Sequence, residues 1–227
     1  TGDAQITGSL TISGSFHAFT LDSDNIVLGS GSGVAMEADA DNNVILGVNA
    51  GNSLTTGNNA VIIGKSAGQA YTTGNLNAVI IGTSAGQNLT SAFAVAIGNN
   101  ALGSTSTGVN SVAIGESAAY SNTGNHVVAI GHRAAYGPSA GTVAIGYSAM
   151  HLQGQPNSVA IGKFALYSAL NSGGSTTAVG MSAGYGITSG GGNTVYGYYA
   201  GYNLAGSGAT GNIIIGSGSL GASGISN

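Results

Sequence analysis

The sequence SVAIGESAA, residues 111–119, contains an apolar triplet closed by a glycine, with an alanine three residues after that glycine. Twelve copies of the triplet and glycine occur between Gly29 and Gly216, spaced by 15 to 19 residues, and ten of them carry the alanine. Such a period indicates units that stack, because one short unit cannot bury its own apolar face. Helical-hairpin repeats and propeller blades need roughly 30 to 50 residues per unit, so each unit is predicted to be one coil of a β-solenoid.

The repeat provides a common numbering for every coil. Position 0 is the glycine that closes the triplet, called the register glycine, and the residues before and after it take negative and positive positions. The register glycines are Gly29, Gly47, Gly64, Gly82, Gly98, Gly115, Gly131, Gly146, Gly162, Gly180, Gly197 and Gly216.

The composition excludes several classes of protein. Glycine accounts for 42 of 227 residues without a strict three-residue period, which excludes collagen, and the regular Val, Ile and Ala positions provide a core that a disordered chain lacks. Cysteine is absent, so disulfides and thiolate metal sites play no part. Only three residues are Lys or Arg, too few to neutralise a run of phosphates, so we expect no nucleic-acid binding. No run approaches the roughly 18 apolar residues that span a bilayer, so we expect no membrane insertion.

The two faces of the triplet decide what each strand packs against. Side chains alternate along a strand, so positions −1 and −3 share one face, which we expect to fill the coil interior. Position −2 lies on the other face and is apolar in all twelve coils, whereas a solvated monomer would carry polar residues there. We therefore expect position −2 to form the interface of a homotrimer, tightest where it is alanine. The six alanines are Ala96, Ala113, Ala129, Ala144, Ala160 and Ala178.

The residues around the triplet are predicted to form turns and one further strand. Asparagine stands four or five residues before the register glycine in most coils and suits a corner with left-handed backbone. The alanine at position +3 is expected in a second short strand whose inward residue must be small. Segments of variable length, such as 52–57 and 168–174, are expected to be surface loops, where recognition residues concentrate.

Several repeats resemble those of known fibrous proteins. SVAIGESAA, TVAIGYSAM (142–150) and SVAIGKFAL (158–166) resemble the head repeats of trimeric autotransporter adhesins. NNVILGVNAG (42–51) and NNAVIIGKSAG (58–68) resemble repeats of bacteriophage tail fibres, and ITGSLTISGSF (6–16) is similar to their entry segments. The resemblance implies a left-handed parallel β-roll in a homotrimer that binds a host surface.

From these observations we expect an all-β chain, a left-handed parallel β-roll of about twelve coils of 15 to 19 residues. Residues 1–24 are expected to be an entry or docking segment, 25–218 the repeat domain and 219–227 a tail. The expected function is a non-enzymatic fibre or adhesin module, most consistent with a phage tail fibre, extracellular or on a virion surface. Its expected partners are its own copies, an upstream fibre or baseplate element, and a host glycan or protein.

Other functions remain open at this point. The chain could be a bacterial autotransporter adhesin head or a subunit of a filament that grows end to end. A polysaccharide-degrading spike is a further class, although Glu116 is the one carboxylate in the later coils and no pair of carboxylates flanks a predicted cleft. No cofactor is expected.

Aromatic residues are the candidate recognition residues. Position +5 is aromatic in six consecutive coils, which predicts a ladder with about 4.8 Å between rungs. Such a ladder either stacks on the sugars of a host glycan or seals a corner of the solenoid. Tyr198 and Tyr199, at positions +1 and +2, are expected to be exposed and are the stronger receptor candidates. The six ladder residues are Tyr120, Tyr136, His151, Tyr167, Tyr185 and Tyr202.

Four aspartates near the N-terminus are candidate calcium ligands. Asp22 and Asp24 precede one coil, and Asp39 and Asp41 precede the next at nearly the same station. Carboxylate and amide oxygens suit calcium, but the twelve-residue calcium-loop pattern is missing. Solvated turn carboxylates are therefore the alternative.

Overall fold

A computed structural model describes residues 19–22, 24–72, 75–89, 93–104, 109–152, 156–168, 174–204 and 210–218. These residues form one sheet of thirteen strands and no helix, so among them no helix exists that could cross a membrane. The strands are β1 (Phe19–Asp22), β2 (Asn25–Leu28), β3 (Val44–Leu46), β4 (Asn58–Ile63), β5 (Asn75–Ile81), β6 (Val95–Ile97), β7 (Val112–Ile114), β8 (Val128–Ile130), β9 (Val143–Ile145), β10 (Val159–Ile161), β11 (Thr177–Val179), β12 (Thr194–Tyr196) and β13 (Ile213–Ile215).

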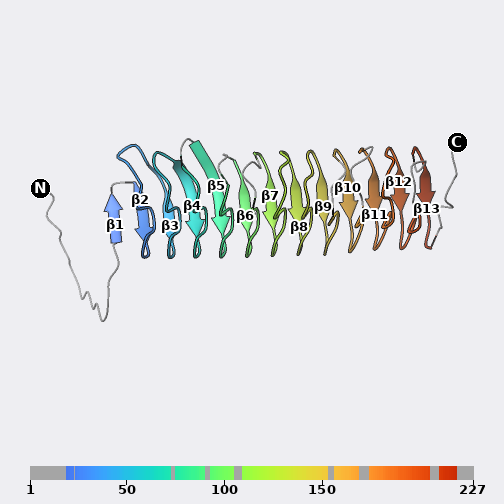
Figure 1. The fold of residues 1–227 in the computed structure, drawn as a ribbon, viewed down its shortest axis with the longest axis horizontal. Helices are drawn as coiled ribbons and strands as arrows, with labels where there is room; N and C mark the ends of the chain where they lie inside the picture. Colours follow the sequence, from blue (N-terminus) through green and yellow to red (C-terminus); the bar gives the residue numbers. More distant parts are fainter. Residues whose placement is uncertain are drawn as a thin grey trace, which may run out of the picture.

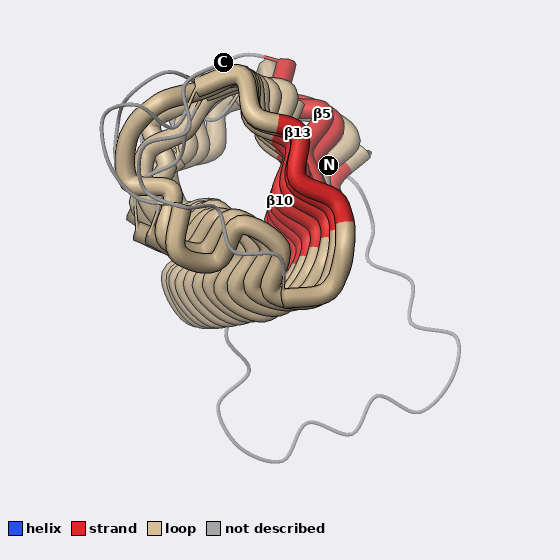
Figure 2. Tube along the Cα trace, turned by 90° about the vertical axis from the view of Figure 1, so that its right-hand side faces the viewer, coloured by secondary structure: helices blue, strands red, loops and turns tan. Residues whose placement is uncertain are grey.

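Strands β2 to β13 pair in parallel in chain order, one strand for each repeat, and β1 pairs with β2 in antiparallel fashion (Figure 1). The pairing follows the repeat: Ala113 of β7 is level with Ala96 of β6 on one side and Ala129 of β8 on the other. Viewed along the stack, the strands lie on one side of each coil and turns complete the rest (Figure 2). The predicted all-β parallel solenoid is confirmed.

The register glycines are required by the backbone. All twelve have φ between 128° and 139°, a region that residues with a Cβ rarely adopt. A Cβ at Gly115 would also lie 2.7 Å from the carbonyl oxygen of Gly131 in the next coil. The glycine therefore ends each strand and allows adjacent coils to approach within hydrogen-bonding distance.

Asparagine occupies two different stations before the strand. At position −5 the backbone is left-handed, with φ of 59° at Asn59 and 56° at Asn110, as the predicted corner requires. At position −4 the side chain instead points inward and is buried, as at Asn25 and Asn43. There Asn25 Oδ1 accepts hydrogen bonds from the backbone nitrogen and Nδ2 of Asn43, 3.0 and 3.1 Å long. Buried amides thus connect consecutive coils.

The predicted assignment of the two strand faces is wrong. Position −2 points into the coil interior, and all six alanines predicted to form the subunit interface are fully buried within the single chain, so none of them can contact another copy. They are Ala96, Ala113, Ala129, Ala144, Ala160 and Ala178. The physical reason is size, because the narrow interior of the middle coils also receives the small residue at position +3 and has no room for Val or Ile.

The alanine at position +3 lies inside the coil as expected, but it belongs to a turn and not to a second strand. Left-handed residues flank it at positions +2 and +4, as in Ser117 (φ 56°) and Ala119 (φ 50°) around Ala118. This alternation prevents an extended conformation. Larger residues at position +7, among them Leu54, Tyr71 and Leu89, fill the wider part of the interior.

Candidate functional site

Two surfaces of the solenoid stand out, and the first is the outer side of the sheet. Positions −3 and −1 of every coil point outward and form two parallel columns, here called the apolar face. Position −3 is Ile26, Val44, Val61, Val79, Val95, Val112, Val128, Val143, Val159, Thr177, Thr194 and Ile213. Position −1 is Leu28, Leu46, Ile63, Ile81, Ile97, Ile114, Ile130, Ile145, Ile161, Val179, Tyr196 and Ile215.

Every residue of the apolar face is half-buried or exposed in the single chain. Ile114 is 36% exposed in the middle of the stack, and Ile213 reaches 76% at its C-terminal end. None of the 24 positions carries an acidic or basic side chain. The columns therefore form an uncharged and mostly hydrocarbon surface along the whole stack, with hydroxyl groups at Thr177, Thr194 and Tyr196.

The second surface is aromatic and confirms the ladder predicted at position +5. The rings of Tyr167 and Tyr185 stack with centroids 5.1 Å apart and planes 6° apart. Neighbouring pairs from Tyr120 to Tyr202 have centroids 4.8 to 5.4 Å apart, and one pair, Tyr136 and His151, is tilted by 41°. Inside the ladder each ring therefore has a ring on either side, one coil above and one coil below.

The same station continues toward the N-terminus with amides in place of rings. Asn52, Gln69 and Gln87 occupy position +5 in three successive coils, and Gln87 Nε2 donates to Gln69 Oε1 at 3.1 Å. Gly103 separates this amide run from the aromatic one. Stacked amides and stacked rings thus occupy the same turn of the coil, where each contacts the equivalent side chain of the next coil. This indicates a structural role for the ladder wherever the ring faces are covered.

A second aromatic row lies beside the ladder and was not predicted. His132 stacks on Tyr147 at 5.1 Å, and Phe164 meets the rings of Tyr147 and Tyr167 edge-on at 5.4 and 5.3 Å. The ammonium group of Lys163 lies 5.1 Å from the centre of the Phe164 ring. His132, Tyr147 and Lys163 occupy position +1 and Phe164 occupies position +2. The counting that identified position +5 would also have found them.

Burial shifts the ionisation of two ladder residues. It lowers the pKa of His151 below its usual 6.5. A hydrogen bond with the Arg133 backbone opposes this shift, and the charge of Arg133 adds to it by a smaller amount. Burial raises the pKa of Tyr185, with the adjacent Tyr202 and Tyr167 adding to the effect. His151 Nδ1 is buried without a hydrogen-bond partner. The neutral form of the ladder is therefore favoured near neutral pH.

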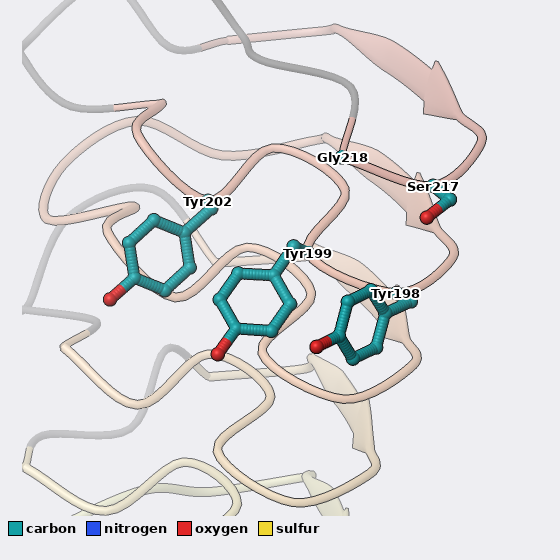
Figure 3. Close-up of a pocket in the computed structure, with 5 residues that line it drawn as sticks. All are labelled: Tyr198, Tyr199, Tyr202, Ser217 and Gly218. Carbon is teal, nitrogen blue, oxygen red and sulfur yellow. The ribbon is translucent and has the colours of Figure 1, made fainter.

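At its C-terminal end the aromatic surface opens into a pocket (Figure 3). Tyr198, Tyr199 and Tyr202 form it together with Ser217 and Gly218 of the next coil. The Tyr198 and Tyr199 centroids are 4.5 Å apart with planes at 56°, and the Tyr199 and Tyr202 centroids are 4.9 Å apart with planes at 31°. Tyr198 is 55% exposed, as expected from the sequence, whereas Tyr199, which was also expected to be exposed, is half-buried.

The acidic residues do not assemble into a metal site in the part of the chain that the structure describes. Asp24 and Asp39 are exposed and Asp41 is half-buried, while the side chain of Asp22 lies outside the described residues. No three acidic or histidine side chains come together there in a way that could hold a metal ion. The calcium prediction gains no support from this geometry.

Comparison with protein-family models, with curated proteins and with solved structures gives no match for this chain. The resemblance to tail fibres and adhesin heads therefore stays a prediction that depends on the repeat motif alone. The parallel solenoid and the geometry of its two surfaces are what the function must be argued from.

Proposed function

We propose that this chain is a non-enzymatic structural module, a stiff rod that associates side by side with two further copies through the apolar face. The assembled rod would serve host attachment as part of a fibre or adhesin outside the cell, on a virion surface if the tail-fibre resemblance holds. The observation that carries the proposal is the outward position of the uncharged, mostly aliphatic columns at positions −3 and −1 along strands β2 to β13.

The apolar face has the properties of a surface that is covered in the working protein. Parallel sheets are normally buried on both faces, and here the inner face is packed while the outer one carries only apolar, threonine and tyrosine side chains. Twelve coils at about 4.8 Å give a face on the order of 55 Å long, far larger than the scattered apolar residues of a monomer surface. Covering it would contribute much of the stability of the assembly.

A second copy of the same chain is the partner that matches this face best. Each coil presents two outward side chains at the same spacing, most of them Val, Ile or Leu, so rods aligned in parallel meet column to column at every coil. Rotation about an axis parallel to the rods closes the contact and stops further growth. In a trimer, each of the three copies would turn its apolar face toward that axis and bury it there.

End-to-end growth into a filament receives less support from the strand arrangement. Strand β1 pairs in antiparallel fashion with β2 and occupies the N-terminal edge of the sheet. A chain that added at that edge would pair with β1 and could not continue the parallel register of the repeats unless β1 left. Side-by-side association requires no such change.

The mass of the protein in solution tests the proposal. We expect about 65 kDa, three times the 21.8 kDa of one chain, by light scattering or native mass spectrometry. Ile130→Lys places a charge in the middle of the apolar face and should shift the mass toward 21.8 kDa, because an unpaired charge is costly to bury. The matched control Thr83→Lys adds the same charge at an exposed position +1, where Lys65 already occurs, and should leave the mass unchanged.

A wild-type protein that stays at 21.8 kDa at all accessible concentrations would contradict the proposal. So would an Ile130→Lys variant that assembles as well as Thr83→Lys.

A further inference from the structure

We infer that the pocket formed by Tyr198, Tyr199 and Tyr202 binds an uncharged pyranose unit of a surface glycan. The inference rests on the proposed attachment function and adds to it the class of receptor and the place where it binds. It depends on three features of the pocket: uncovered ring faces, an uncharged lining and a size suited to a small ligand.

The first feature distinguishes this pocket from the rest of the aromatic surface. Inside the ladder, rings about 5 Å apart cover each other, so a sugar cannot reach their faces; Tyr167, for example, has His151 at 5.2 Å and Tyr185 at 5.1 Å. At positions +1 and +2 the coil after Tyr198 and Tyr199 carries Ser217 and Gly218. Tyr199 lies between the rings of Tyr198 and Tyr202, 4.5 and 4.9 Å away, so Tyr198 is the most open of the three. The small residues of the next coil leave the sides of the rings that face them uncovered, and the space they leave is the pocket.

The chemistry of the lining selects the ligand. The surface that lines the pocket is almost entirely apolar, and none of the described residues that form it is charged. The polar side-chain groups of these residues are the hydroxyls of the three tyrosines and of Ser217, which expose little surface to the pocket. A pyranose ring presents a face of C–H bonds, which packs against an aromatic ring, and a rim of hydroxyl groups, which exchange hydrogen bonds with tyrosine and serine. A phosphate or a sialic acid would find no cation in the lining to pair with.

The arrangement in Figure 3 fits such a ligand. The three rings lie in a row and their phenolic oxygens point in similar directions, away from Ser217 and Gly218. The cavity holds about 320 Å³, at the lower end of the range of ligand pockets. This volume suits one or two sugar units and leaves a longer glycan free to continue into solvent.

The pocket is also placed so that assembly of the rod does not need it. Strand β12 ends at Tyr196 on the apolar face, and the chain turns away from the sheet at Gly197, whose φ is 132°. Tyr199 and Tyr202 belong to the following turn. Sugar binding and self-association can therefore be measured separately.

The test uses saturation-transfer NMR with the full-length protein and four probes: methyl β-glucopyranoside, methyl β-galactopyranoside, methyl α-mannopyranoside and N-acetylneuraminic acid. We expect transfer to at least one methyl pyranoside and none to the charged sugar. Ser217→Tyr should reduce the affinity for that pyranoside about tenfold, because it adds one more ring to the column and covers Tyr198, removing a contact of about 1.4 kcal/mol. Tyr198→Ala should have an equal effect by removing the ring.

Tyr167→Ala is the matched control, since it removes a tyrosine whose faces are covered. It should lower the melting temperature and leave sugar binding unchanged. Ser217→Tyr should melt no lower than the wild type, which separates blocked binding from misfolding.

Two outcomes would overturn the inference: no transfer to any of the three pyranosides, or transfer that Ser217→Tyr and Tyr198→Ala leave intact. If the pocket is instead a contact between copies of this chain, the two variants reduce the assembled mass and sugar transfer is absent. Loss of sugar binding with an unchanged mass of about 65 kDa supports the inference, whereas a monomeric wild type that still binds sugar contradicts only the proposed assembly.

Discussion

Replacing one register glycine with alanine in the middle of the stack, Gly131→Ala, should destabilise the solenoid strongly. Gly131 has φ of 128°, and an added Cβ would lie 2.6 Å from the carbonyl oxygen and 2.8 Å from the carbonyl carbon of Gly146 in the next coil. Both atoms belong to the backbone, so neither can rotate away. The two coils would have to separate, which lengthens the hydrogen bond from Gly146 N to Ile130 O, now 2.8 Å.

The magnitude follows from two costs. Holding a residue with a Cβ at this φ costs about 1 to 3 kcal/mol, and forcing an extra methyl group into a packed contact costs about 1 to 3 kcal/mol more. The sum is about 2 to 6 kcal/mol. For a chain of this length about 1 kcal/mol lowers the melting temperature by about 2 to 4 °C, so the midpoint of the range corresponds to about 8 to 16 °C.

Gly216→Ala separates the two costs. Gly216 has nearly the same φ, 129°, but its Cβ would meet no atom within 4 Å. It should therefore show the conformational cost alone. Calorimetry gives the global change, and hydrogen exchange followed by mass spectrometry gives the local change, since each coil contacts only its neighbours. We expect loss of protection over the coils around Gly131 that exceeds the loss around Gly216.

The reasoning fails if Gly131→Ala melts within about 2 °C of the wild type. A shift that small corresponds to a loss of less than about 1 kcal/mol of stability. It also fails if both variants lose equal local protection, because the contact between coils would then contribute nothing.

Two further predictions concern the interior and the ladder. Ala129→Val should destabilise the protein by about 1 to 3 kcal/mol in denaturant titrations, because the interior has no space for two more methyl groups. It should leave the solution mass unchanged, since Ala129 is buried within one chain. A changed mass at unchanged stability would show instead that position −2 lies in the subunit interface. Burial lowers the pKa of His151, so the imidazole binds a proton more readily in the unfolded chain than in the folded one. The stability that neutral His151 provides should therefore fall as pH drops below about 6.5. Melting temperatures at about pH 5 and pH 8 should therefore differ more in the wild type than in His151→Tyr, which continues the ladder with a ring that stays neutral; equal differences would rule out this role.

The architecture could be read from the sequence because each station of the coil has its own steric requirement. Glycine at position 0 is demanded by φ near 130° and by the next coil, and asparagine at position −5 by a left-handed corner. Both signals recur with the period, so single exceptions do not hide them. The same counting placed the aromatic rings of position +5 in one column, and their stacking confirms it.

The orientation of the strand could not be read in the same way. Alternation shows that position −2 opposes positions −1 and −3, but both sets are apolar here, so hydrophobicity does not tell inside from outside. The polar residues of position −4 add to the ambiguity. They suggest solvent, yet Asn43 is buried, with Nδ2 donating to the carbonyl oxygen of Gly57 at 2.8 Å.

The pocket at Tyr198, Tyr199 and Tyr202 shows the same division. The sequence set Tyr198 and Tyr199 apart from the ladder by their stations, +1 and +2, but it did not show that they form one pocket with Tyr202 of the ladder. The pocket tyrosines differ from the ladder in whether a neighbouring ring covers the faces of their own rings. That depends on which residue the next coil carries at the same position. At Tyr198 that residue is Ser217.

The sequence by itself thus determined the period, the parallel stacking and the stations that must be glycine, because these follow from backbone geometry repeated at every coil. Only the tertiary structure decided which side of each strand is inside and which ring faces remain open. Those properties depend on the width of the coil and on contacts between residues about one coil apart. Neither can be deduced from the order of residues along a single strand.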